Sequence, residues 1–184
     1  VVDSRLEIAP SARILQPPGT VWVYTTADPA ESAARRSALL AQGVTVIDCP
    51  GAKDKVGKVD LPTLLRDLAR RGVNELHVEA GHKLNGSFLR EGLVDELLLY
   101  LAPKLLGEGA GLAALGPFEA LEQAPSLQFV DVERVGPDLR VRARPSGPAL
   151  RRSWHESGPG FRCSVQRPIC AAGGWSRPGR STAL

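Results

Sequence analysis

The most constraining stretch of this sequence is residues 75–89, where an alternating apolar segment stops at a glycine and a helix-forming segment begins. Residues 75–79 have the period of a strand, Gly81 ends it, and the pattern after Gly81 is that of a helix. In α/β proteins such a turn commonly binds a ligand, because the first N–H groups of a helix have no partner within it. A further apolar strand follows at 97–102. We therefore predict an α/β fold.

The residues before this stretch repeat the alternation of strands and helices. Asp28 and Pro29 suit the cap and the first position of a helix that ends before Gly43. Leucines at helical spacing after Asp60 predict a second helix with one apolar face. The predicted elements up to residue 102 are strands at 20–25, 44–48, 75–79 and 97–102, and helices at 28–42, at 60–71 and from Gly81 onward.

The pattern changes after Gly107, where further glycines mark a loop. Residues 126–133 and 139–143 alternate on either side of the turn Gly136-Pro137-Asp138, which predicts an antiparallel hairpin added to the sheet. The fold class predicted is therefore α/β, with a mixed sheet flanked by helices and a C-terminal antiparallel hairpin.

Residues 146–184 differ in composition from the rest of the chain. Arginine, proline, glycine and serine predominate without a strand or helix period, so we predict a domain at 1–145 followed by a largely disordered basic tail. Six arginines and one glutamate lie in 151–184, which leaves residues 1–150 with a net charge of −2. Binding to nucleic acid would depend on the tail, and we favour this hypothesis least. Its aromatic residues that could stack on bases are Trp154, Phe161 and Trp175.

Other features restrict the class and location of the protein. No apolar run is long enough to span a bilayer, which predicts no membrane segment. The three cysteines, at 49, 163 and 170, form neither a disulfide framework nor a zinc-ligand spacing, so we predict a reduced, cytoplasmic protein without a metal. The chain begins at Val1 rather than Met, and we expect it to be part of a longer protein.

The turn at Gly81 has two interpretations. Gly81 and Gly86 have the spacing of a P-loop, but Ser87 stands where that motif needs lysine, which excludes a nucleoside triphosphatase of this kind. The backbone N–H groups could still bind phosphate, with Lys83 adding a positive charge. The alternative is a plain strand-to-helix turn that binds nothing.

Three ionisable side chains lie in or beside this turn. Glu79 ends the strand on the side where parallel sheets bind ligands, although it could equally form a surface ion pair. His82 lies in the turn and could contact a ligand, whereas His77 lies inside the strand and is expected to be a packed or surface residue. The sequence contains no Ser-His-Asp order and no nucleophile elbow.

Several short motifs occur in one order along the chain. Val78-Glu79-Ala80-Gly81 is followed by Leu84-x-Gly86-x-Phe88-Leu89, by Gly92-Leu93-Val94-Asp95-Glu96-Leu97 and by Leu101-Ala102-Pro103-Lys104-Leu105-Leu106-Gly107. The opening residues 1–6 and the turn at 135–139 belong to the same pattern. Over roughly residues 1–145 this order resembles the reductase domain of the bifunctional riboflavin-biosynthesis deaminase/reductase family.

The resemblance implies a dihydrofolate-reductase-like fold and NADPH-dependent reduction of 5-amino-6-(5-phosphoribosylamino)uracil, a small-molecule substrate whose ribose is opened to a ribityl chain. It implies that Ser4 contacts the cofactor and that Glu79 contacts the substrate. It also implies a homodimer, to which 95–102 could contribute. No general acid is evident, and hydride transfer would depend on positioning. The residues implied to bind the dinucleotide are Gly81, His82, Lys83, Leu84, Asn85, Gly86 and Ser87.

The sequence departs from the family pattern in two respects. His82 and Lys83 stand where the family usually has smaller residues, so we expect an altered phosphate contact. The zinc deaminase domain and the first strands of the reductase domain are expected to lie outside this chain. A second hypothesis is a non-catalytic remnant that keeps the nucleotide-binding turn without turnover. NADPH binding without reduction would identify such a remnant.

Overall fold

The computed structural model of the chain describes residues 1–146 and 161–169, except for 17, 52–55, 106 and 110. The chain divides into two compact units, Val1–Arg71 and Gly72–Leu184. The division falls inside the stretch 1–145 that the sequence predicts to be one domain. Within the described residues, no helix is long and apolar enough to cross a bilayer.

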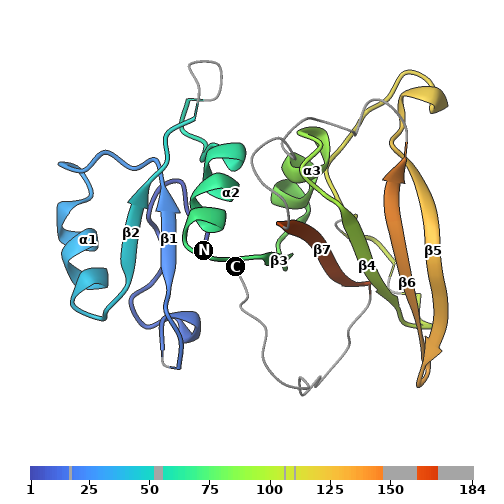
Figure 1. Ribbon diagram of the computed structural model, residues 1–184, viewed down its shortest axis with the longest axis horizontal. Helices are drawn as coiled ribbons and strands as arrows, with labels where there is room; N and C mark the ends of the chain where they lie inside the picture. Colours follow the sequence, from blue (N-terminus) through green and yellow to red (C-terminus); the bar gives the residue numbers. More distant parts are fainter. Residues whose placement is uncertain (17, 52–55, 106, 110, 147–160, 170–184) are drawn as a thin grey trace. The chain divides into compact units, whose positions relative to one another are not determined.

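The first unit contains a short parallel sheet and two helices (Figure 1). Val2 forms a parallel bridge to Tyr24, so the start of the chain runs beside the first strand. The core of this unit is a cluster of buried apolar side chains: Leu6, Leu15, Val23, Leu39 and Val44. The elements are η1 (Arg13–Leu15), β1 (Trp22–Thr25), α1 (Ala33–Leu40), β2 (Thr45–Asp48) and α2 (Leu61–Arg70).

The helix α2 begins and packs as the sequence predicts. The Asp60 carboxylate accepts a hydrogen bond from the Thr63 N–H at 2.9 Å, which satisfies one of the unpaired donors at the helix start. The four leucines of the predicted apolar face, Leu61, Leu64, Leu65 and Leu68, are all buried. Burial of this stripe is what fixes the helix to its unit.

The helix α1 is shorter than the predicted span 28–42. The carboxylate of Asp28 accepts hydrogen bonds from the N–H groups of Ala30 and Glu31, at 2.8 and 3.2 Å, and so closes a turn of its own. The regular helix therefore starts only at Ala33. A short polar side chain that binds nearby backbone competes with helix formation at this position.

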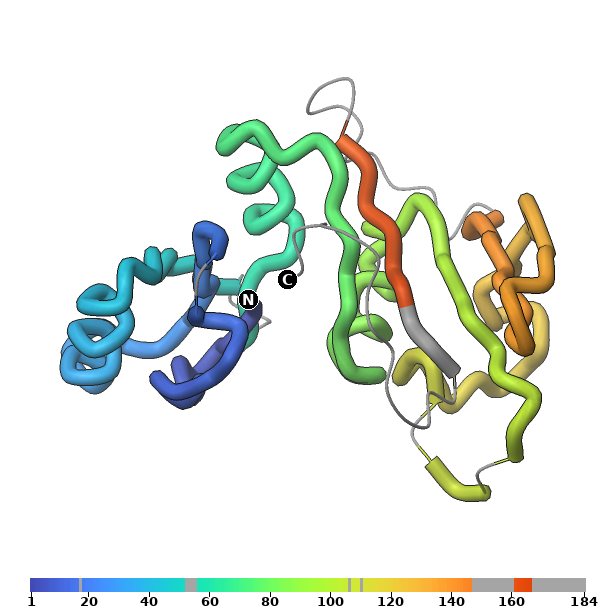
Figure 2. Tube along the Cα trace, turned by 90° about the horizontal axis from the view of Figure 1, so that it is seen from below, coloured from blue at the N-terminus to red at the C-terminus, as the bar shows by residue number. Residues whose placement is uncertain are grey.

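The second unit is built around a five-stranded mixed sheet, which Figure 2 shows from another side. The strand order is β3-β7-β4-β6-β5; β3, β7 and β4 are mutually parallel, and β6 and β5 are antiparallel. The predicted hairpin is confirmed as β5 and β6. The elements are β3 (Glu75–Val78), α3 (His82–Arg90), β4 (Glu96–Leu101), η3 (Leu121–Gln123), β5 (Ser126–Val135), β6 (Asp138–Ser146) and β7 (Arg162–Ile169).

The strand β7 corrects one prediction, because it lies in the tail that the sequence predicts to be disordered. It occupies a central position, and its Cys163 and Val165 are fully buried. The Cys163 N–H donates to the Asp95 carboxylate at 2.8 Å, and the Asp95 N–H donates to the Cys163 carbonyl at 2.8 Å. Pairing on both sides stabilises a short segment whose own pattern is weak, since it alternates over few residues and contains Pro168. The remaining tail residues, with Trp154 and Trp175, lie outside the described residues.

Candidate functional site

The turn between β3 and α3 leaves backbone donors at the start of the helix. Gly81 is the N-cap and makes no side-chain cap, and the first helical hydrogen bond runs from the Asn85 N–H to the Gly81 carbonyl at 3.1 Å. The N–H groups of residues 81–84 precede that bond and have no acceptor inside the helix. No acidic residue lies in the first helical turn, and Lys83 is exposed. The turn thus has the donors and the charge that suit a phosphate.

Two of the predicted cofactor residues face the protein interior. Asn85 is fully buried, and its Nδ2 donates to the carbonyls of Ala80 and Leu112, at 3.3 and 3.2 Å. A methyl group added to Gly86 would collide with the backbone of Ala114, whose nitrogen would lie 2.8 Å from it. Gly86 therefore serves close packing between α3 and the segment Leu112–Ala114. The sequence pattern gave no sign of this segment.

The other members of the predicted turn differ in exposure. His82 is half-buried, and its carbonyl accepts a hydrogen bond from the Ala114 N–H at 2.8 Å. The Ser87 hydroxyl lies one turn further along, donates to the Lys83 carbonyl at 3.2 Å and accepts from Arg90 at 3.1 Å. Leu84 is half-buried and Gly81 is exposed.

Glu79 and His77 lie at and before the end of β3. The exposed Glu79 follows the last strand residue, as the sequence predicts. His77 is half-buried, with its Nδ1 2.9 Å from the Ser164 hydroxyl of β7. This contact links two paired strands, so His77 packs within the sheet, which is one of the two placements that the sequence predicts.

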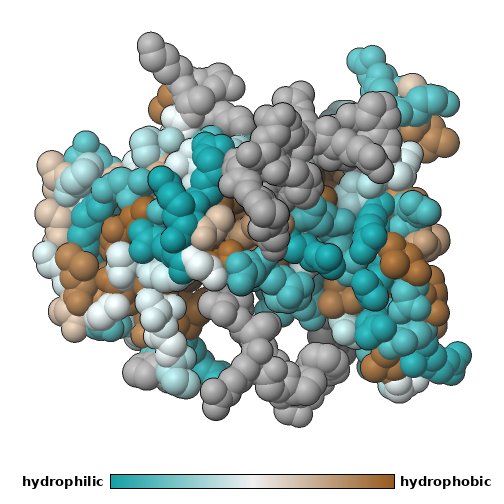
Figure 3. Space-filling model, viewed as in Figure 1, coloured by the Kyte–Doolittle hydropathy of each residue, from teal (hydrophilic) through white to brown (hydrophobic). Residues whose placement is uncertain are grey.

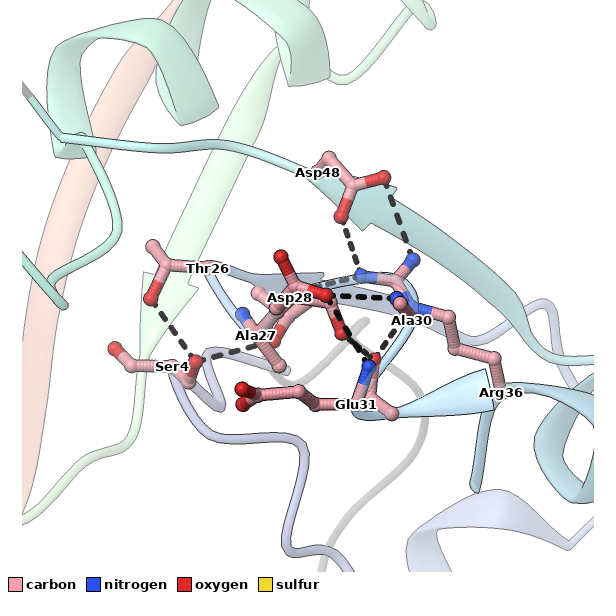
Figure 4. A network of polar contacts seen from close by, with 10 residues as sticks. Ser4, Thr26, Ala27, Asp28, Ala30, Glu31, Arg36 and Asp48 are labelled. Carbon is pink, nitrogen blue, oxygen red and sulfur yellow. Dashed lines mark hydrogen bonds and ion pairs between the residues drawn. The ribbon is translucent and has the colours of Figure 1, made fainter. Parts of the chain in front are cut away.

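Ser4 lies in the first unit, at the carboxyl end of β1, and Figure 4 shows its surroundings. Its carbonyl accepts hydrogen bonds from the Thr26 N–H at 3.1 Å, the Thr26 hydroxyl at 3.0 Å and the Thr25 hydroxyl at 3.2 Å. Three donors on one carbonyl fix the backbone at Ser4. Ser4 and the turn at Gly81 belong to different units.

Arg36 joins the end of β2 to the segment that follows β1 (Figure 4). The Arg36 guanidinium contacts both carboxylate oxygens of Asp48, at 2.6 and 3.3 Å, and donates to the Ala27 carbonyl at 2.8 Å. The Arg36 Nε donates to the Ser32 hydroxyl at 2.8 Å. A bidentate pair of this kind positions a loop. The sequence offered only the single charges, far apart along the chain, and did not reveal the pair.

Two carboxylates of the described residues, one in each unit, have lowered pKa values. Hydrogen bonds from Arg142 lower the pKa of Glu96 on the sheet of the second unit. In the first unit burial raises the pKa of Asp67, but hydrogen bonds from Arg71 and Tyr24 outweigh this effect and leave it below its ordinary value. In the described part of the chain, no group of three metal-ligating side chains lies together.

Comparison with known proteins gives one consistent result. The pattern of the RibD C-terminal domain family matches residues 1–141. The Escherichia coli riboflavin biosynthesis protein RibD is 38% identical over 140 residues, which cover 76% of this chain and 35% of that protein. A 5-amino-6-(5-phosphoribosylamino)uracil reductase from Buchnera aphidicola is 29% identical over 147 residues, covering 79% of this chain and 66% of that protein.

Solved structures agree with the sequence comparisons. The structure of Acinetobacter baumannii RibD superposes with a TM-score of 0.63 at 30% identity, covering 79% of this chain and 36% of that one. A Thermotoga maritima deaminase/reductase has a TM-score of 0.58 at 22% identity, which shows the fold alone. These likenesses and the mixed sheet confirm the predicted dihydrofolate-reductase-like fold class. The chain spans about a third of the length of the E. coli and A. baumannii proteins.

Proposed function

Because the chain belongs to the RibD C-terminal domain family, we propose that it performs the reductase step of riboflavin biosynthesis. The reaction is the NADPH-dependent reduction of 5-amino-6-(5-phosphoribosylamino)uracil to its ribitylamino form, in a cytoplasmic setting. The observation that supports it is the uncapped N-terminus of α3, which meets the end of a parallel strand inside the family-matched region. A longer parent would also perform the pyrimidine deaminase step.

The cofactor supplies a hydride when bound, and this chain supplies binding and orientation. The N–H groups of residues 81–84 bind a phosphate of the dinucleotide, and Lys83 adds a positive charge next to them. Within the first unit, Ser4 is the proposed cofactor contact, held in a fixed position at the end of β1. Glu79 orients sugar hydroxyls of the substrate by charge-assisted hydrogen bonds.

Binding of NADPH tests this proposal first. We expect the melting temperature of the purified chain to rise with NADPH concentration and to respond less to NADH, because a ligand of the native state stabilises it. Lys83→Ala should weaken the response, whereas the exposed Lys104, in the same unit, provides a matched control as Lys104→Ala. An equal response of both variants would contradict the assigned phosphate contact.

Turnover separates the two candidate functions. An active reductase oxidises NADPH only when 5-amino-6-(5-phosphoribosylamino)uracil is present. A non-catalytic remnant binds NADPH and leaves it unoxidised under the same conditions. A chain that shows neither binding nor turnover would contradict both functions.

We also propose that the chain forms a homodimer. One face of the sheet in the second unit carries exposed apolar side chains, which a second copy of the chain would cover. Leu101 pairs with Leu139 in register, and Phe129 and Val132 lie on the same face of the neighbouring edge strand β5. Their exposed fractions are 36, 43, 70 and 54%, and apolar atoms are visible on this part of the surface (Figure 3). Exposed apolar patches of this kind mark association surfaces.

The oligomeric state of substituted chains tests this face. Phe129→Arg should shift the mass measured by light scattering from dimer to monomer. Val56→Arg, at a residue 85% exposed in the first unit, should leave that mass unchanged. A monomeric unmodified chain would contradict the proposal.

A further inference from the structure

The segment Leu112–Ala114 is attached to α3 by several independent contacts along the helix. The Ala114 N–H donates to the His82 carbonyl at 2.8 Å, and the Ala114 carbonyl accepts from the Arg90 guanidinium. Asn85 Nδ2 donates to the Leu112 carbonyl at 3.2 Å. The missing side chain of Gly86 leaves the space that the Ala114 backbone fills. The segment and the helix start therefore form one packed body.

The Asn85 side chain has a fixed orientation at the centre of these contacts. It is fully buried, and its Nδ2 faces two carbonyl oxygens, those of Ala80 and Leu112. The reversed amide would place an oxygen against both acceptors, so the nitrogen must occupy this position. Among the described residues, Asn85 Oδ1 has no hydrogen-bond partner. A buried acceptor without a partner is unusual and often belongs to a functional site.

These contacts act on the donors of the turn through the geometry of the peptide bond. In a trans peptide the carbonyl of one residue and the N–H of the next point in opposite directions. Holding the Ala80 carbonyl therefore fixes the direction of the Gly81 N–H. Holding the His82 carbonyl fixes that of the Lys83 N–H in the same way. Asn85 holds the Ala80 carbonyl directly, and it holds the His82 carbonyl indirectly, through Leu112 and Ala114.

We propose that Asn85 is a positioning residue of the turn between β3 and α3, where the proposed function places a phosphate of the cofactor. It joins the segment Leu112–Ala114 to the end of β3 and so sets the direction of the Gly81 and Lys83 N–H groups toward a phosphate. This inference deepens the proposed function and rests on the turn being the cofactor site. Asn85 itself touches only protein.

Amide exchange and cofactor affinity, measured on the full chain, test the proposal together. In Asn85→Ala the Ala114 N–H should exchange at least about tenfold faster, the factor that corresponds to one lost hydrogen bond of about 1.4 kcal/mol. The dissociation constant of NADPH should rise by about the same factor. Asn74→Ala makes the same chemical change at an exposed residue in the same unit and should alter neither quantity.

Each outcome decides between the proposal and its alternatives. Faster exchange at Ala114 with unchanged NADPH affinity would show that Asn85 serves stability alone and would overturn the proposal. Unchanged exchange would overturn it as well. If the unmodified chain does not bind NADPH, the proposed function fails, and inorganic pyrophosphate becomes the probe of the turn.

A measurement without substitution covers the case in which Asn85→Ala does not fold. In the unmodified chain, pyrophosphate should shift the amide resonances of Gly81 and Lys83 more than those of Asn74 and Lys104. Equal shifts would overturn the proposal.

Discussion

Replacing Gly86 with alanine tests the close packing of α3 against Leu112–Ala114. A methyl group there would meet the Ala114 backbone, with the nitrogen 2.8 Å and the carbonyl carbon 2.9 Å away. Real Cβ contacts are longer, so the segment must move away from the helix. The bonds at risk join Ala114 to His82 and to Arg90, and Leu112 to Asn85.

The magnitude follows from these contacts. Three hydrogen bonds at about 1 kcal/mol each give a loss of about 3 kcal/mol. Alanine has a higher helix propensity than glycine by about 1 kcal/mol, which offsets part of this loss. We expect Gly86→Ala to lower the free energy of unfolding by about 2 kcal/mol, within the range measured for overpacked cores.

Urea denaturation, followed by circular dichroism, measures this change. Gly81→Ala is the matched control, because no atom lies within 4 Å of a Cβ at that position and its φ is −72°. The control should lose no more than about 1 kcal/mol, because alanine is a poorer N-cap than glycine. An unchanged stability of Gly86→Ala, or an equal loss in the control, would refute the packing argument.

Three further predictions concern stability. Asp60→Ala should destabilise the chain by about 1 kcal/mol, since it removes the α2 cap, and Asp60→Ser should restore most of the loss in urea denaturation. The Asp67 carboxylate, whose folded pKa is lowered, adds stability that is complete above its ordinary pKa of 3.8 and lost as the pH falls through the folded value. Asp67→Asn should therefore flatten the decline in urea midpoint as the pH falls below about 4, and an unchanged slope would refute the assignment. Val165→Asp should abolish cooperative melting of the second unit, because it buries an unpaired charge, whereas the exposed Val56→Asp should be neutral.

Much of the fold could be predicted because the pattern of single residues determines it locally. The strands β3 and β4 lie within one residue of their predicted bounds, and the leucine stripe of α2 is buried as its spacing requires. Asp28 shows the limit of such reasoning, since its side chain closes a turn and delays α1. Composition misled the prediction for β7, whose burial depends on neighbours far away in the sequence.

The candidate site could be predicted only in part. The glycine turn was visible as a pattern, and its family resemblance is confirmed over residues 1–141. The resemblance included Gly86 among the dinucleotide contacts, while the structure shows the packing that this glycine permits with Ala114. The part played by Leu112–Ala114 had no local signal, because it consists of backbone contacts from a loop of small residues. The cofactor role of the turn stays a prediction.

The central place of β7 has a consequence for biosynthesis. The strands β3 and β4 are each paired to β7, and its Ser164 hydroxyl contacts the carbonyl of Leu76, 88 residues earlier in the chain. A ribosome releases the amino-terminal strands first, so the sheet of the second unit must wait until Ile169 has emerged. Contacts of such long range slow folding and prolong the exposure of unpaired strand edges. We therefore expect this unit to complete its sheet late and to need chaperones more than the first unit does.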